Sequence, residues 1–168
     1  MDMMQRRAAL IGSLKKDNVA YEAYNLSFDG TDSTVINTGL YLFTAENINR
    51  DFEFIAEGIV GANISHSTII CAKHNGNSYG FLVRTTGSTN TTYKGTIFVK
   101  PAPNIAKVII RRENGVITMS GENITNPQAS FVNNVFAWPL VLGCAIEDDG
   151  SHYRHATGTI EHVKVTWL

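Results

Sequence analysis

After residue 20 the chain consists of short apolar runs separated by polar turns. The run DFEFIAEGIV, residues 51–60, alternates with the period of two that is expected of a β-strand. One predicted face carries Phe52, Phe54, Ala56 and Gly58, and the other carries Glu53, Ile55, Glu57 and Ile59. Residues 107–123, KVIIRRENGVITMSGEN, predict a hairpin, because the Asn-Gly pair supplies the positive φ angles of a tight turn.

More strands are predicted in residues 67–87, on either side of a second Asn-Gly pair, and in residues 139–146 and 158–168. After the start of the chain, only residues 44–51 and 127–134 offer a helical turn. The pattern contains about ten or more strands, with turn signals about every 8 to 12 residues. We therefore predict an all-β fold, a two-sheet antiparallel jelly-roll sandwich over residues 21–168, after a short helical or extended lead over residues 1–20.

Composition limits the classes of partner that are expected for this sandwich. The 168 residues carry a formal net charge of -1 and scattered basic side chains, so no nucleic-acid partner is expected. No run of about 18 apolar residues occurs, which argues against membrane insertion. The apolar stretch of the lead is interrupted by Gly12 and Ser13, so we find no signal peptide in this chain. Cys71 and Cys144 lie in apolar runs and are expected to be buried thiols, with a bridge between the sheets as the alternative.

Two segments resemble concanavalin A-like, laminin-G-like jelly-roll domains. Residues 24–43, YNLSFDGTDSTVINTGLYLF, match an opening in which a strand ends in Phe-Asp-Gly and the next ends in Thr-Gly. The closing pattern of that family is matched by Leu142 and Gly143, followed by Gly158, Ile160, Val163 and Val165. In the Phe28-Asp29-Gly30 turn, Gly30 is expected where the backbone needs positive φ, and Asp29 is expected to cap the turn.

The lead QRRAALIGSLKK, residues 5–16, resembles junction segments in phage and prophage tail proteins that carry such a module. The two resemblances imply a non-catalytic carbohydrate-binding adhesion module on a virion or an extracellular surface. Its implied partners are a cell-surface glycan and other tail or virion proteins, in an oligomer such as a homotrimer. A purely structural or oligomerisation module of a virion is the first alternative. A glycoside hydrolase of the same fold is the second.

The residues EDDGSHYRHATG, 147–158, hold two of the five histidines, His152 and His155. A transition-metal site needs three or four ligands, usually with two of them on a rigid element. Residues three apart on a strand point to opposite faces, and no cysteine is nearby in sequence. We therefore expect a loop without a bound transition metal. Weaker Ca²⁺ candidates are Asp29 with Asp32, and Asp148 with Asp149, because Ca²⁺ prefers carboxylate oxygens.

Catalytic residues are not predicted. Glycosidases of this fold carry a Glu-x-Asp-x-Glu strand, and the nearest match here runs from Glu53 to Glu57 with Ile55 in place of the central aspartate. For sugar contact, exposed aromatic rings and short polar donors in loops are the expected features. The candidate carbohydrate-binding residues are His152, Tyr153, Arg154, His155, Tyr79, Tyr93 and Trp138.

Overall fold

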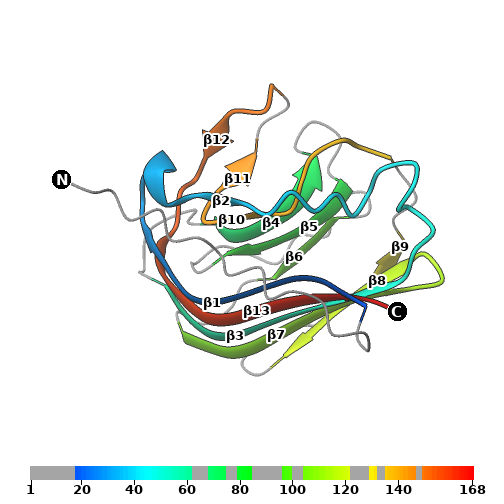
Figure 1. The fold of residues 1–168 in the computed structure, drawn as a ribbon, viewed down its shortest axis with the longest axis horizontal. Coiled ribbons are helices and arrows are strands. Elements are labelled where there is room, and N and C mark those ends of the chain that lie inside the picture. Colours follow the sequence, from blue (N-terminus) through cyan, green and yellow to red (C-terminus); the bar gives the residue numbers. More distant parts are fainter. Residues whose placement is uncertain are drawn as a thin grey trace.

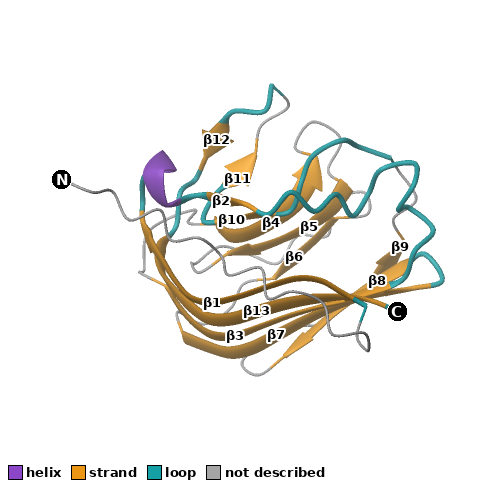
Figure 2. Cartoon of the chain, viewed as in Figure 1, coloured by secondary structure: helices purple, strands orange, loops and turns teal. Residues whose placement is uncertain are grey.

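The computed structural model describes residues 18–61, 68–74, 79–84, 96–99, 104–121, 129–131, 135–146 and 149–168, and statements about the fold concern these residues. They form a β-sandwich, with one 3-10 turn among the strands (Figure 2). The all-β prediction is therefore confirmed. Residues 1–17 of the predicted lead, like Tyr93 and Asp148, lie outside the described residues, and the last residues of that lead already belong to the first strand, which begins at Val19. No helix in the described part of the chain is long and apolar enough to cross a membrane.

Two sheets pack face to face, and the six-stranded one curves beneath the five-stranded one (Figure 1). The six-stranded sheet has the order β1-β13-β3-β7-β8-β9. Its strands are β1 (Val19–Asp29), β13 (Thr157–Trp167), β3 (Phe52–Gly61), β7 (Asn104–Glu113), β8 (Val116–Gly121) and β9 (Ala129–Phe131). The five-stranded sheet has the order β2-β10-β4-β5-β6. Its strands are β2 (Ile36–Asn37), β10 (Val141–Leu142), β4 (Thr68–His74), β5 (Tyr79–Arg84) and β6 (Thr96–Val99).

The core lies between the inner faces of the two sheets, as alternation along the strands predicts. Phe52 and Phe54 of β3 meet Phe81 of β5 across it, with ring centroids 6.2 and 5.9 Å from that of Phe81. The predicted hairpin is confirmed as β7 and β8, which pair around Asn114 and Gly115, both at positive φ. The strands on either side of the second Asn-Gly pair are confirmed as β4 and β5, although the turn itself lies outside the described residues.

The six-stranded sheet contains a bend that the sequence pattern misses. Along β3 the inward side chains end at Ala56, and the next buried one is Ile59, which is fully buried. The prediction that Ile59 shares the outer face with Glu57 is therefore wrong. The break in alternation falls at Gly58, where φ is +61°. In β1 the same break falls at Asn25, where φ is 52°. Because β13 lies between β1 and β3, these two residues mark one bend across neighbouring strands.

Three smaller expectations need correction or refinement. The two sheets are not wholly antiparallel, because β5 and β6 pair in parallel. Of residues 127–134, for which a helical turn was expected, the described part Ala129–Phe131 forms the edge strand β9 instead. Residues 139–146 are not one strand: Gly143 turns the chain between β10 and β11 (Ala145–Ile146). The helical turn at residues 44–51 is confirmed by the bond that the Ile48 amide donates to the Thr44 carbonyl, at 2.8 Å.

A small hairpin covers the outer side of the five-stranded sheet. It consists of β11 and β12 (His152–Tyr153), which pair with each other and lie above β4 in Figure 1. Tyr153 packs there against a small cluster of Cys71, Leu82 and Ala145. Both cysteines are buried thiols that are not bridged, as the first of the two expectations had it, and burial raises the pKa of the Cys144 thiol to about 12.

The turn after β1 has the predicted form. Gly30 has φ of +88°. The Asp29 Oδ1 atom accepts hydrogen bonds from the amide of Thr31 and from the hydroxyls of Thr31 and Thr34, at 2.7 to 2.9 Å. These bonds favour the ionised carboxyl and lower the pKa of Asp29. They also fix the start of η1 (Asp32–Thr34), which lies in the loop that follows β1 at the edge of the sandwich.

Candidate functional site

The candidate site lies where β1 ends and β13 begins. These strands are antiparallel, and Asp29 is paired with Thr157. Residues that follow Asp29 and residues that precede Thr157 therefore leave the sheet at the same edge. Asp32 opens η1 three residues after Asp29, and His155 lies two residues before Thr157. The strand pairing thus brings together residues that are more than 100 positions apart.

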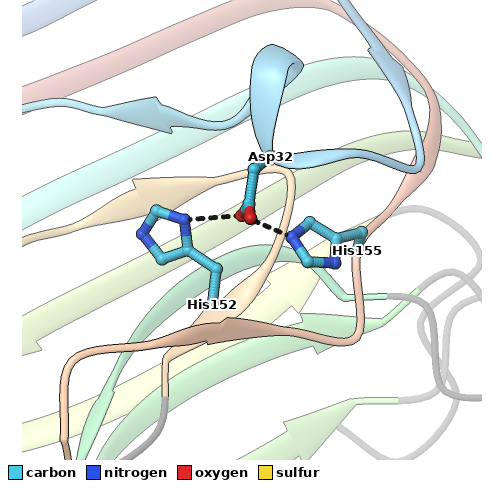
Figure 3. Close-up of side chains that lie close together, drawn as sticks. All are labelled: Asp32, His152 and His155. Carbon is cyan, nitrogen blue, oxygen red and sulfur yellow. Dashed lines mark hydrogen bonds and ion pairs between the residues drawn. The ribbon is translucent and has the colours of Figure 1, made fainter.

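Asp32, His152 and His155 converge at this edge (Figure 3). The Asp32 Oδ1 atom is 3.0 Å from His152 Nδ1 and 2.8 Å from His155 Nε2. The exposed fractions of the side chains are 72% for Asp32, 32% for His152 and 22% for His155. One carboxylate oxygen is therefore held between two imidazole nitrogens at the rim of the sandwich, where solvent reaches it.

The two histidines reach one point because the chain turns between them. Strand β12 ends at Tyr153, and Arg154 adopts a φ of 53°, which interrupts the alternation of a strand. The expectation that His152 and His155 point to opposite faces is therefore wrong. Neighbouring residues anchor the turn: the Arg154 carbonyl accepts the Thr68 amide at 3.0 Å, and the amide of Ala156 donates to Gly143 at 2.7 Å.

The electrostatics of the site favour an ionised carboxylate. Hydrogen bonds from His155 and then His152 lower the pKa of Asp32. Each of the three residues offers one ligand atom, and the three atoms lie within 4.8 Å of one another. In the part of the chain that the structure describes, no other group of three His, Cys, Asp or Glu residues meets this condition.

Two further candidates for sugar contact lie in the same loop. The Arg154 guanidinium stands over the Tyr153 ring, 4.9 Å from its centroid. Trp138 also approaches this loop, because a Cβ atom on Gly150 would lie 3.1 Å from the indole ring. Trp138 is half-buried and packs against the core, so little of its ring is available to a ligand. Tyr79 begins β5, and its side chain is outside what the structure describes.

The acidic Ca²⁺ candidates have separate tasks in the structure. Asp29 caps the turn before η1, as described above. Asp149 caps another turn, because its Oδ1 atom accepts the Ser151 amide at 2.8 Å. Asp32 faces the two imidazoles. The carboxylates of Asp29 and Asp32 thus engage different partners, and their role as joint Ca²⁺ ligands stays a prediction.

A second polar cluster, which the sequence did not predict, lies on the outer face of the six-stranded sheet. His162 of β13 sits between two carboxylates, with Nε2 3.0 Å from Glu22 and Nδ1 3.3 Å from Glu57. The Tyr24 ring stacks on the imidazole at 4.6 Å, and its hydroxyl donates to Glu22. Only the pairing of β1, β13 and β3 reveals this group, because its members come from three strands.

The Glu53 and Glu57 pair of the glycosidase alternative also lies on this outer face. Glu57 is 2.8 Å from Lys107, and Glu53 is 3.8 Å from Arg111. The hydrogen bond from Lys107, and then that from His162, lowers the pKa of Glu57. A general acid for glycoside cleavage needs a raised pKa. The pKa of Glu57 is therefore shifted in the direction opposite to that which a general acid requires.

Comparison with solved structures shows that this fold is similar to part of a sialidase. A mutant of the NanB sialidase from Streptococcus pneumoniae matches with a TM-score of 0.55 and 11% identity. The match covers 86% of this chain and 26% of the sialidase chain. NanB with Optactamide matches with the same score and identity, over 87% of this chain and 26% of that one. No family model matches the chain, and no curated protein matches it either.

These comparisons correct one prediction. The chain was expected not to be an enzyme, and this is contradicted because both matching structures belong to a sialidase, which is an enzyme. At 11% identity the likeness shows the fold alone, and the chain spans about a quarter of the length of the solved structures that it matches. The chain is thus a β-sandwich whose fold recurs within a carbohydrate-active protein.

Proposed function

We propose that this domain binds carbohydrate through the loop edge that carries Asp32 and residues 152–155. The observation that carries the proposal is the set of groups gathered there: a carboxylate, two imidazoles, and a guanidinium standing over a tyrosine ring. Sugar hydroxyls donate to carboxylates and accept from guanidinium groups. The Tyr153 ring contributes by holding the Arg154 guanidinium over its face. A shared fold with part of a sialidase, an enzyme that acts on carbohydrate, supports the same conclusion.

The site is shallow, which sets the expected strength of binding. Asp32 and Arg154 are exposed, so each hydrogen bond to a sugar replaces one to water. Such an exchange is worth only about 0.5 to 1.5 kcal/mol. We therefore expect a dissociation constant of about 10⁻³ to 10⁻⁵ M for a single glycan. Several copies on one particle would be needed for firm adhesion.

The test is an array of neutral and acidic glycans, probed with the full chain and two variants. Tyr153→Leu removes the ring over which the Arg154 guanidinium lies, while keeping an apolar group against Cys71 and Leu82. Arg154→Gln removes the charge and keeps the length of the side chain. We expect each variant to weaken the glycan signal by about tenfold or more, since one tenfold step is about 1.4 kcal/mol. Thermal unfolding of both variants checks that the fold is kept.

The matched control is Tyr24→Leu, which removes an aromatic side chain that is 57% exposed on the outer face of the six-stranded sheet. Glycan binding should be unchanged in this variant. Loss of the signal in Tyr24→Leu, or an unchanged signal in both loop variants, would contradict the placement of the site. The glycans that bind are also incubated with the protein. Release of reducing sugar that disappears in Glu57→Gln would move the carbohydrate site to the outer face.

The proposal also includes the location of this domain and its protein partners. The lead segment over residues 5–16 supports a place on a phage or prophage tail, with a cell-surface glycan and other virion proteins as partners. Light scattering of the purified chain tests the expected homotrimer. A trimer that binds no glycan would favour the purely structural role in a virion.

A further inference from the structure

We propose that Asp32, His152 and His155 form a binding site for a divalent transition-metal ion such as Zn²⁺. The three ligand atoms converge, because a single carboxylate oxygen faces both imidazole nitrogens. This inference goes beyond carbohydrate binding, since it needs no glycan. It also replaces the expectation that the two histidines are loop residues without a transition metal, whose premise of divergent side chains is wrong.

The chemistry of the donors selects the ion. Two imidazole nitrogens and one carboxylate oxygen form the kind of set that binds Zn²⁺ in sites with an open coordination position. Imidazole suits the later transition metals, whereas Ca²⁺ takes six to eight oxygen ligands. In this structure Asp29 and Asp149, each three positions from one of the ligands, are both engaged in capping their own turns. The site therefore favours a transition metal over Ca²⁺.

The separations of the ligand atoms fit this assignment. With bonds of about 2.0 to 2.1 Å, neighbouring ligands of a tetrahedral Zn²⁺ ion lie about 3.3 Å apart. The carboxylate oxygen is 3.0 and 2.8 Å from the two nitrogens, and all three atoms lie within 4.8 Å of one another. To bind one ion, the exposed Asp32 carboxylate moves outward by a few tenths of an ångström, and the two imidazole rings turn until their nitrogens also lie about 3.3 Å apart.

The arrangement at Asp32 differs from that of the second histidine cluster, around His162. It also lies between two carboxylates, but its two ring nitrogens each face one of them. The carboxylates of Glu22 and Glu57 are therefore on opposite sides of the imidazole ring and do not meet at one point. At the loop edge the reverse holds, because two rings each direct one nitrogen toward one oxygen. A histidine beside acids is present in both places, and only the loop edge has converging donors.

The protein holds the three ligands in place before any ion arrives. Asp32 is fixed by η1, whose first turn is closed by the bond from the Val35 amide to the Asp32 carbonyl. His152 belongs to β12, where it pairs with Ile146, and the buried Ala156 follows His155. The exposure of Asp32 leaves the remaining coordination positions open to water or to an oxygen ligand from solution.

The test uses the full, untagged chain after treatment with a chelator. Calorimetric titration with ZnCl₂ alone should show one ion bound per chain, and elemental analysis after dialysis should find the same ratio. CaCl₂ should not bind. Asp32→Asn, His152→Gln and His155→Gln should each weaken Zn²⁺ binding by at least about tenfold, because loss of even a supporting partner costs 10- to 100-fold. Titration with Co²⁺ adds a visible absorption band that reports direct nitrogen and oxygen ligation.

His162→Gln is the matched control, since it removes a histidine that also contacts carboxylates. It should leave Zn²⁺ binding unchanged. The proposal is overturned if the wild-type chain takes up no stoichiometric Zn²⁺, or if His152→Gln and His155→Gln bind it as tightly as wild type. A loss in His162→Gln equal to that in His155→Gln would also overturn it. None of these readouts involves a glycan, so failure here is separable from failure of carbohydrate binding.

Discussion

The side chain of Arg112 on β7 donates from Nε to the main-chain carbonyl of Arg50, at 2.9 Å. Its Nη2 atom also donates to the carbonyls of Leu42 and Asn47. Arg112 is fully buried, with its guanidinium above the rings of Phe43 and Phe52. Burial lowers the pKa of Arg112 to about 10. One buried cation thus ties the loop over residues 41–51 to the six-stranded sheet.

Replacement of this residue should destabilise the fold strongly. Arg112→Met leaves the main-chain carbonyls of Leu42, Asn47 and Arg50 without this donor, and we expect the free energy of unfolding to fall by about 3 to 5 kcal/mol. Urea denaturation measures the change. The control is Arg111→Met, because the neighbouring arginine is 44% exposed and forms only surface ion pairs with Glu53 and Glu113. It should cost less than about 1 kcal/mol. Equal losses of unfolding free energy in the two variants would show that Arg112 does not tie the loop over residues 41–51 to the sheet.

The bend at Gly58 gives a second prediction. Gly58→Ala places a methyl group at a φ of +61° and 2.4 Å from the side chain of Glu161. We expect a loss of about 1 to 3 kcal/mol in the free energy of unfolding. Gly39→Ala is the control, because φ is +69° there and a Cβ atom meets nothing within 4 Å. The difference between the two variants isolates the contact with Glu161. Addition of Glu161→Ala to Gly58→Ala should recover that difference, and no recovery would disprove the contact.

The cluster of Glu22, Tyr24, Glu57 and His162 on the outer face of the six-stranded sheet predicts that the stability of the fold depends on pH. Hydrogen bonds from Tyr24 and then His162 lower the pKa of Glu22, and those from Lys107 and then His162 lower the pKa of Glu57. A lowered pKa in the folded state means that the stabilisation is present above the ordinary value of 4.5 and is lost as pH falls through the folded value. Stability should therefore fall as the pH drops below about 4.5.

Thermal unfolding of Glu57→Gln across this pH range tests the dependence. The variant lacks one carboxylate that must be protonated, so its melting temperature should fall less steeply with acid than that of the wild type. Glu46→Gln is the control, since this residue lies on the exposed turn of residues 44–51 away from the cluster. Parallel curves for Glu57→Gln and wild type would show that the cluster contributes nothing to the acid response.

The cysteines give a prediction about reactivity. Burial raises the pKa of Cys144 to about 12, and Cys71 is equally buried. The thiolate is the reactive form, so neither residue should react with a thiol reagent at pH 8 in the folded protein. Both thiols should react in guanidinium chloride. The exposed Ser151→Cys variant supplies a positive control. A single fast-reacting thiol in the native wild type, or fewer than two after unfolding without reductant, would contradict this.

The sequence by itself determined the class of the fold. Alternation in residues 51–56 requires a strand with one buried face, and the Asn-Gly pair at Asn114 requires a tight hairpin turn. The role of Asp29 as a turn cap was also readable, because its partners lie within five residues. These features are local, and local chemistry is what a single sequence displays.

Only the tertiary structure decided the candidate site. Asp32 and His155 are 123 positions apart, and they meet because β1 pairs with β13 in the register that sets Asp29 opposite Thr157. The φ of 53° at Arg154 then turns His155 toward the point that His152 already faces. Sequence spacing alone does not predict that turn, because an arginine rarely adopts a positive φ. The pairing register and one backbone angle, both fixed by the packing of the whole sandwich, turn three scattered polar residues into a set of converging ligands.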